Sequence, residues 1–160
     1  MTQNNLGNAY RDLPSGNRAV NVERGITAYE AALGVLTQKE FPVDWAMTQN
    51  SLGLAYLAMP GDSIANLQRA IAAFEAALSI YTEKDFSVEW AKGQLNLALA
   101  YSRMSGGSDT EILKKAKEAL EAALRVFEES RFPDYHGLSA ELLLVVDQQL
   151  RSTRPEKESR

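Results

Sequence analysis

The sequence predicts an all-α protein of stacked helical hairpins, because two families of segments recur along it at one fixed period. The first family reads "MTQNNLGNAY", "WAMTQNSLGLAY" and "WAKGQLNLALAY", and it places Tyr10, Tyr56 and Tyr101 at intervals of 46 and 45 residues. A second family alternates with the first. Regular self-similarity of this kind is typical of repeat proteins. Each repeat is therefore predicted to hold an A segment followed by a B segment.

The B segments begin at Asn21, Asn66 and Ile112, again 45 and 46 residues apart. The apolar residues of the middle copy are Leu67, Ala70, Ile71, Phe74, Ala77 and Leu78. They recur three and four positions apart, which is the spacing of one buried face of an α-helix. Alanine and glutamate, both strong helix formers, enrich the same segments. We therefore expect every A and B segment to be a helix.

Short turns with helix-ending residues separate these helices. "LPSGN", "MPGDS" and "MSGGSD" follow the A segments, and proline and glycine there end one helix before the next begins. Ser108 and Glu111 have the spacing of a capping box. "KEFPVDW", "KDFSVEW" and "SRFPDYH" follow the B segments, and Pro42 and Pro133 suit the first turn of a helix.

One hairpin cannot bury its apolar face alone, so the hairpins are expected to stack into a single domain over residues 1–152. The predicted parts are repeats over 1–41, 42–86 and 87–132 and a capping helix over 133–152. Asp147 stands where a fourth tyrosine would recur, as suits a terminal face. Residues 153–160 form a charged tail, predicted to be disordered. Because the first copy lacks the "WA" of the others, we expect a segment of a longer array or one that opens on an unfinished repeat.

Composition narrows the class of function. The chain has 160 residues, no cysteine and a formal net charge of −4. An acidic surface opposes phosphate binding, which argues against a nucleic-acid partner. The absence of cysteine excludes disulfides and thiolate metal sites. No apolar run approaches the roughly 18 residues of a membrane helix. We expect a cytoplasmic protein without a membrane partner.

Residues for catalysis are sparse. His136 is the only histidine, and it falls in the first turn of the capping helix, where a surface role is expected. The glycines of "SGGSDTEILKK" follow a helix and lack the spacing of a phosphate-binding loop. Glu30, Glu75 and Glu121 recur at the period of the array, which indicates scaffold residues. We expect no enzyme activity, no cofactor and no metal.

The repeated residues resemble the tetratricopeptide repeat family. That family pairs Leu-Gly and Tyr in helix A with Ala-x-x-x-Phe in helix B. Leu52, Gly53 and Tyr56 match the first part, and Ala70 with Phe74 matches the second. The resemblance covers nearly all of the chain before the tail. It implies a right-handed α-α superhelix whose A helices line a concave groove.

Two departures point to a long-period variant of this family. The usual period is about 34 residues, and the present one is longer. Trp45 and Trp90 lie one helical turn before the family's tryptophan position. The chain is in this respect similar to the arrays of kinesin light chains and of large bacterial signalling proteins.

The resemblance also implies which residues face the groove. It maps Asn4, Asn5, Asn8 and Arg11 from the first A helix, Met47, Asn50, Ser51, Leu54 and Leu57 from the second, and Lys92, Leu95, Asn96, Leu99 and Arg103 from the third. The predicted peptide-binding set is Asn4, Asn5, Asn8, Asn50, Leu54, Lys92, Leu95, Asn96, Leu99 and Arg103. Asparagine amides would pair with an extended backbone, and the leucines would take apolar side chains.

Two roles stay open for the asparagines, since Asn5 and Asn96 could equally bridge neighbouring helices. Two functions also stay open for the chain. The first is a non-enzymatic scaffold that binds a protein or peptide segment in the groove. The second is a structural, self-assembling or sensor segment of a larger bacterial signalling protein. A homo-oligomer through the first repeat belongs to this second hypothesis, because Leu6 and Tyr10 would be partly uncovered there.

Overall fold

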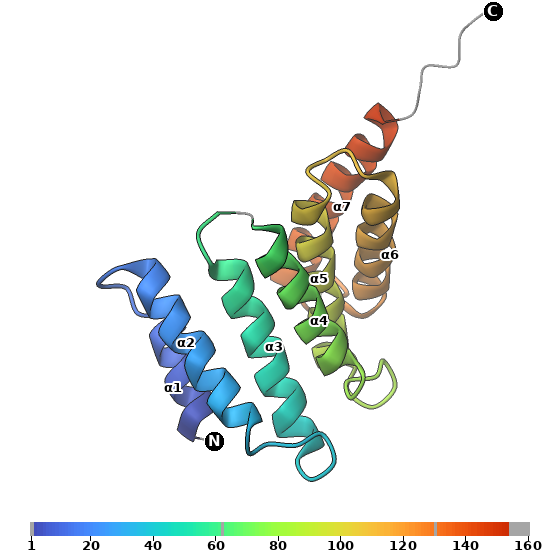
Figure 1. Cartoon of the computed structure of the whole chain (residues 1–160). Coiled ribbons are helices and arrows are strands. Elements are labelled where there is room, and N and C mark those ends of the chain that lie inside the picture. Colours follow the sequence, from blue (N-terminus) through green and yellow to red (C-terminus); the bar gives the residue numbers. More distant parts are fainter. Residues whose placement is uncertain (1, 62, 130, 154–160) are drawn as a thin grey trace, which may run out of the picture.

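The protein is entirely helical in the part that the structure describes, which is residues 2–61, 63–129 and 131–153 of a computed structural model. Seven α-helices follow one another without a strand in these ranges, as Figure 1 shows. They are α1 (Thr2–Arg11), α2 (Arg18–Leu33), α3 (Pro42–Ala58), α4 (Ile64–Leu78), α5 (Ser87–Met104), α6 (Thr110–Val126) and α7 (Pro133–Ser152). The all-α prediction is thus confirmed. Apart from Thr153, the tail predicted to be disordered lies outside the described residues.

Three turns that precede α3, α5 and α7 share one backbone geometry. Phe41, Phe86 and Phe132 take φ of −135°, −139° and −135° with ψ of 60°, 55° and 57°. The backbone amide of each donates a hydrogen bond to the carbonyl oxygen four residues earlier, at 2.9, 2.9 and 2.8 Å. The sequence period is therefore also a period of local structure. The helices begin at Pro42, Ser87 and Pro133, the residues at which the sequence places its repeat boundaries.

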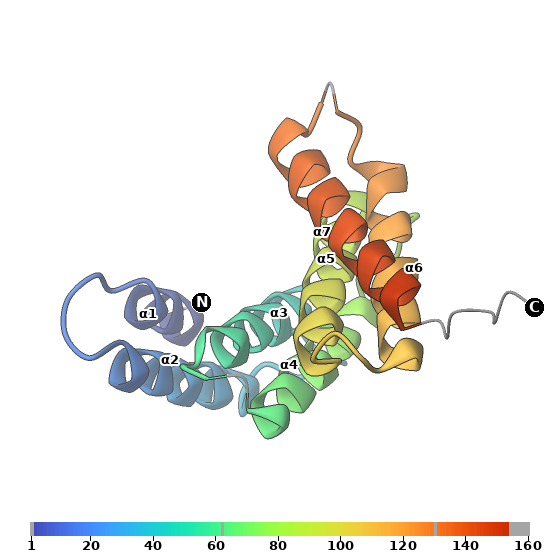
Figure 2. The ribbon, with the colours of Figure 1, turned by 90° about the horizontal axis from the view of Figure 1, so that it is seen from above.

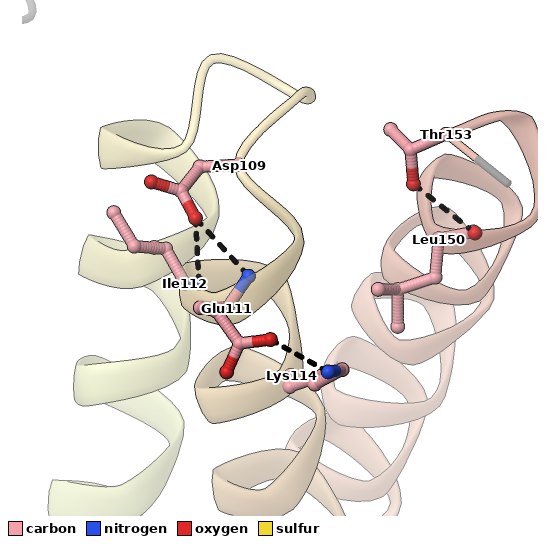
Figure 3. A network of polar contacts seen from close by, with 6 residues as sticks. All are labelled: Asp109, Glu111, Ile112, Lys114, Leu150 and Thr153. Carbon is pink, nitrogen blue, oxygen red and sulfur yellow. Dashed lines mark hydrogen bonds and ion pairs between the residues drawn. The ribbon is translucent and has the colours of Figure 1, made fainter.

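Side-chain caps start two of the B helices. The Asn17 Oδ1 atom accepts hydrogen bonds from the amides of Ala19 and Val20 at 3.0 and 3.3 Å. In α6 the cap is Asp109, whose Oδ1 atom accepts from the amides of Glu111 and Ile112, both at 3.1 Å (Figure 3). The expected capping box of Ser108 and Glu111 is wrong by one residue. A carboxylate at Asp109 satisfies two amides of the first turn, which leaves no such role for the serine.

The helices form two rows of unequal spacing. Each helix packs on its neighbours in the chain, and α1, α3, α5 and α7 also approach one another in succession. In the described ranges the backbones of α2, α4 and α6 stay more than 8 Å apart from one another. The row of odd-numbered helices is therefore the inner side of a bend, which Figure 2 shows from above.

Glycines let the first two hairpins close tightly. A Cβ atom placed on Gly7 would lie 2.5 Å from the ring of Tyr29, and one on Gly53 would lie 2.5 Å from the ring of Phe74. Tyr29 and Phe74 are both fully buried. In the third hairpin the equivalent positions hold Ala98 and Leu120. An aromatic ring in helix B therefore occurs together with a glycine at the facing position of helix A.

Candidate functional site

The inner row carries two adjoining hollows on α3, α5 and the start of α7. The first, of about 410 Å³, is lined by Val43, Met47, Asn50, Tyr81, Phe86, Glu89 and Lys92. The second, of about 150 Å³, is lined by Asn50, Leu54, Lys92, Leu95, Asn96 and Tyr135. Asn50 and Lys92 line both, so the two hollows adjoin at these residues. We call the residues of the two hollows together the inner groove.

An asparagine pair crosses the inner groove. The Nδ2 atom of Asn96 donates a hydrogen bond to Oδ1 of Asn50 at 3.1 Å, which ties α5 to α3. The bridging role that the sequence left open is therefore present for Asn96. Within the described ranges, Nδ2 of Asn50 and Oδ1 of Asn96 make no hydrogen bond of their own. The pair can thus still offer one donor and one acceptor.

Lys92 lies between the two hollows without a carboxylate partner in the described part of the chain. Its Nζ atom is 5.3 Å from the ring centroid of Tyr135, a cation–π contact. Tyr135 in turn stacks on Phe127, with centroids 4.9 Å apart and planes 17° from parallel. Because Phe127 is fully buried, it fixes the tyrosine ring. The lysine charge therefore lies beside an aromatic ring that is stacked on the core.

Aromatic side chains form the floor of the first hollow. Tyr81 is buried, and its ring meets that of Phe86 edge-on at a centroid distance of 5.5 Å. The Tyr81 hydroxyl donates to the carbonyl oxygen of Val43 at 3.4 Å. Burial, followed by the charges of Glu89 and Asp44, raises the pKa of Tyr81 above its usual value. The hydroxyl accordingly stays protonated and anchors the start of α3.

The predicted set divides between the groove and other places. Asn50, Leu54, Lys92, Leu95 and Asn96 come together in the inner groove, although Leu95 is only 6% exposed. Leu99 remains 37% exposed on α5 but does not line either hollow. The guanidinium of Arg103 donates to the carbonyl oxygen of Leu57 at 2.9 Å, an internal contact between α5 and α3.

The asparagines of α1 do not line the inner groove. Asn4 is only 2% exposed, so its prediction as an accessible groove residue is wrong. The equivalent residue of α5, Leu95, is also buried, whereas the equivalent residue of α3, Asn50, is half-buried and lines both hollows. Asn8 accepts a hydrogen bond from the Tyr29 hydroxyl at 2.7 Å, while Asn5 is exposed elsewhere. Ser51 and Leu57 of the wider mapping are likewise buried.

The sequence-based set missed Tyr135 in the second hollow, and in the first hollow it missed Val43, Met47, Tyr81, Phe86 and Glu89. Tyr135 occupies the position of Glu89 and Asp44 in the earlier turns, within "FPDYH". The turn motif could have pointed to it, because Phe132 repeats Phe41 and Phe86. The sequence shows that a tyrosine replaces the acid at this position, but it does not show which helix the tyrosine contacts. Tyr135 reaches the groove only because α7 packs on α5 and α6.

In the described ranges, no three His, Asp or Glu side chains lie where they could hold a metal ion. His136 is half-buried in the first turn of α7. None of the helices described is long and apolar enough to cross a membrane.

Comparisons with family models, with curated proteins and with solved structures found no match to this chain.

Proposed function

We propose that the chain is a non-enzymatic interaction module that binds a peptide or protein segment in its inner groove. The observation that carries the proposal is that two hollows adjoin at Asn50 and Lys92, where the Asn50–Asn96 hydrogen bond also lies. An extended segment presents donors and acceptors alternately along its backbone. Asn50 Nδ2 and Asn96 Oδ1 would meet one of each, and the hollows would take its side chains.

The residues around that polar pair favour a segment of mixed character. Met47 and Val43 are 40% and 46% exposed, and both line the first hollow. Exposed apolar side chains that gather at one place favour a binding surface. Lys92 adds one positive charge between the hollows and would favour an acidic or carboxyl-bearing ligand residue near Tyr135. Glu89 stands at the other hollow and would favour a basic residue there.

We further propose that the stack is a long-period tetratricopeptide-like solenoid with a right-handed superhelical path. The alternation of inner and outer helices supports this, as do the matched turns at Phe41, Phe86 and Phe132. In the first two hairpins, the glycine of the Leu-Gly pair packs against the aromatic ring of helix B, as Gly7 does on Tyr29 and Gly53 on Phe74. Under this proposal the inner groove is the concave surface of the array.

A selection from random peptides tests the groove directly. A displayed library of linear peptides would be panned against the immobilised 160-residue chain, and the affinities of enriched peptides measured by fluorescence anisotropy. The groove variant is Met47→Ala/Lys92→Ala, and the matched control is Ile64→Ala/Lys84→Ala, which removes an apolar residue and a lysine at exposed positions elsewhere.

We expect the groove variant to weaken binding at least about tenfold, a loss of roughly 1.4 kcal/mol, with no change in the control. Circular dichroism would show that both variants keep the wild-type helix content. Equal binding by the groove variant and the wild type would rule the inner groove out. A failure to enrich any peptide over an unrelated helical protein would count against the proposal as well.

A further inference from the structure

A third hollow adjoins the inner groove at Leu54. It has a volume of about 520 Å³ and is lined by the end of α1, the turn to α2, the start of α2 and the end of α3. Leu54 lines both this hollow and the second one. The exposed Leu13 and the half-buried Ala58 belong to the lining, so part of the wall is apolar. The hollows of the inner row therefore reach from the start of α3 to its end.

The residues of α3 that line the three hollows lie on one side of that helix. They recur three and four positions apart and are Val43, Met47, Asn50, Leu54 and Ala58. In the inner row α3 lies between α1 and α5 (Figure 2). From the first to the last of these residues the helix rises about 22 Å, since each residue adds about 1.5 Å. An extended segment advances about 3.3 Å per residue, so about seven residues would cover all three hollows.

The third hollow carries more positive than negative charge. Arg11 and Arg18 line it together with Asp12. The Arg11 guanidinium is paired with the Asp12 carboxylate through hydrogen bonds of 2.9 and 3.1 Å. Arg18 is exposed and has no ion-pair partner among the residues that the structure describes. One net positive charge therefore remains at this hollow.

Helix formation does not explain the arginine at position 18. Arg18 is the first residue of α2, and the first turn of this helix holds no acidic residue. A positive charge at the N-terminus of a helix opposes the helix dipole, whereas a negative charge there is favourable. The cap of α2 is Asn17, whose side chain accepts hydrogen bonds from two amides of the first turn. A carboxylate from a ligand would therefore be attracted to Arg18, which its own helix leaves without a counter-charge.

The opposite end of the row of hollows is acidic. Glu89 lines the first hollow and is exposed. Asp44 is exposed as well, and its charge, like that of Glu89, acts on the Tyr81 hydroxyl in this hollow. Lys92 lies farther along, where the first and second hollows adjoin. An occupant that follows α3 would thus meet carboxylates at the start of the helix and a guanidinium at its end.

We propose that the occupant of the inner groove is an extended segment that also enters the third hollow and carries one basic and one acidic residue about five to seven positions apart. The basic residue lies at Glu89 and Asp44, and the acidic residue lies at Arg18. Between them the Asn50–Asn96 pair bonds the backbone of the segment. This inference rests on the proposed function of the inner groove, and it adds the third hollow, the length of the segment and the spacing of its charges.

Selection from long peptides tests the spacing. A displayed library of random linear peptides of about 16 residues would be panned against the full chain, since a helical occupant would need about 15 residues to cover the same 22 Å. The same library would be panned against Arg18→Glu and against Arg24→Glu. The second variant is the matched control, because it makes the same change at an exposed position of the same helix that lines none of the three hollows.

The wild type and the control are expected to enrich peptides with a basic and an acidic residue about five to seven positions apart, in either order. Arg18→Glu is expected to enrich a second basic residue in place of the acidic one. The reciprocal variant Glu89→Lys should instead replace the basic residue of the selected peptides with an acidic one. Its control is Glu118→Lys, at an exposed position of α6 outside the three hollows.

Binding of one selected peptide, measured by fluorescence anisotropy, gives the size of the effect. Arg18→Glu should raise the dissociation constant of the wild-type peptide about three- to tenfold, because an attraction becomes a repulsion. Arg24→Glu should leave it unchanged. Replacing the acidic residue of the peptide with lysine should weaken binding to the wild type and restore binding to Arg18→Glu. The substitution is favourable to the N-terminus of α2, and circular dichroism would show that the helices persist.

The outcomes separate this inference from the proposed function. Peptides that need Met47 and Lys92 but bind Arg18→Glu as well as the wild type would overturn the inference and leave the proposed function standing. Charges about 15 positions apart in the selected peptides would show a helical occupant and overturn the extended segment. A failure to enrich any peptide would overturn both.

Discussion

The junction of α2 with α3 and the junction of α6 with α7 occupy equivalent places in the repeat but are built from different groups. At the first, the Tyr56 hydroxyl donates to Glu30. At the last, Asp147 replaces the tyrosine opposite Glu121, and two carboxylates face the same region. Lys117 lies between them, 2.7 Å from Asp147 and 3.7 Å from Glu121. A neutral donor at one junction is thus replaced by a cation at the other.

The hairpins differ in a parallel way. Gly53 lies against the ring of Phe74, whereas the third hairpin places Ala98 and Leu120 at the same positions. All three side-chain-bearing residues are fully buried. The third hairpin thus has a methyl group at Ala98 where the second has a glycine, and it has no aromatic ring at Leu120 where the second has Phe74. The difference teaches that each packing position constrains the pair of residues, and not either residue alone.

We expect the largest loss of stability when a methyl group is added at Gly53, because Phe74 occupies the space that it would need. Gly53→Ala would place its Cβ atom 2.5 Å from a ring atom of Phe74, which is fully buried, so the ring or a helix must shift. Overpacking of a core costs about 1–3 kcal/mol, and alanine recovers about 1 kcal/mol of helix propensity. We therefore expect a net loss of up to about 2 kcal/mol in the free energy of unfolding, measured with urea.

A second substitution sharpens the same test. Gly53→Ala/Phe74→Leu recreates the pair of the third hairpin, so its cost should be at least about 0.5 kcal/mol less than the sum of the two single costs. Ala98→Gly is the matched control, expected to lose about 1 kcal/mol of helix propensity without any clash. Strict additivity of Gly53→Ala and Phe74→Leu would show that the two positions are not packed as a pair.

The tyrosine junction is expected to show an intermediate effect that depends on pH. Burial, the hydrogen bond to Glu75 and the charge of that carboxylate raise the pKa of Tyr101 to about 12. The unfolded chain loses this proton near pH 10, and the native state keeps it until about pH 12. Stability from this group is therefore complete below pH 10 and falls as the pH rises through that window.

Tyr101→Phe tests this assignment. It removes the hydrogen bond to Glu75, so we expect a loss of about 1 kcal/mol at neutral pH. The variant should also lose less stability than the wild type between about pH 7 and pH 11, because one titrating group is gone. Part of the alkaline loss will remain, since burial also raises the pKa of Tyr29 and Tyr56. An identical alkaline loss in both proteins would contradict the role given to Tyr101.

The sequence was sufficient for the helices and their order because the relevant signals are local. Periodic apolar residues, proline and glycine mark the starts at Pro42, Ser87 and Pro133 without reference to any partner. The capping-box spacing places the cap of α6 one residue early. Ser108 and Asp109 are both capable caps, and only the backbone path decides between them.

The candidate site was less predictable because it depends on how the helices rotate against one another. Asn4 and Asn50 hold the same repeat position, yet Asn4 is buried and Asn50 lines both hollows. Tyr135 enters the groove only because α7 brings it beside Lys92 of α5. Residue type and spacing predict on which side of its helix a residue lies. They do not predict how much of that residue a neighbouring helix buries.

The lysine junction should show the smallest effect, visible mainly as a response to salt. The Lys117 amine donates to Asp147, and this contact together with the nearby carboxylates raises the pKa of the lysine. Both side chains are about one-third exposed, at 36% and 30%, so salt can screen their attraction. Raising NaCl from about 0.1 M to 1 M shortens the Debye length from about 10 Å to 3 Å and should weaken the docking of α7.

The matched pair is Asp147→Asn, which removes one charge, and Tyr101→Phe, which removes none. Salt should destabilise the wild type and Tyr101→Phe equally and Asp147→Asn less, with protection of the α7 amides followed by hydrogen exchange. Equal salt responses in all three proteins would mean that the ion pair contributes nothing measurable. The last junction would then be held by the burial of Val146 against α6, and Lys117 would add no measurable stability.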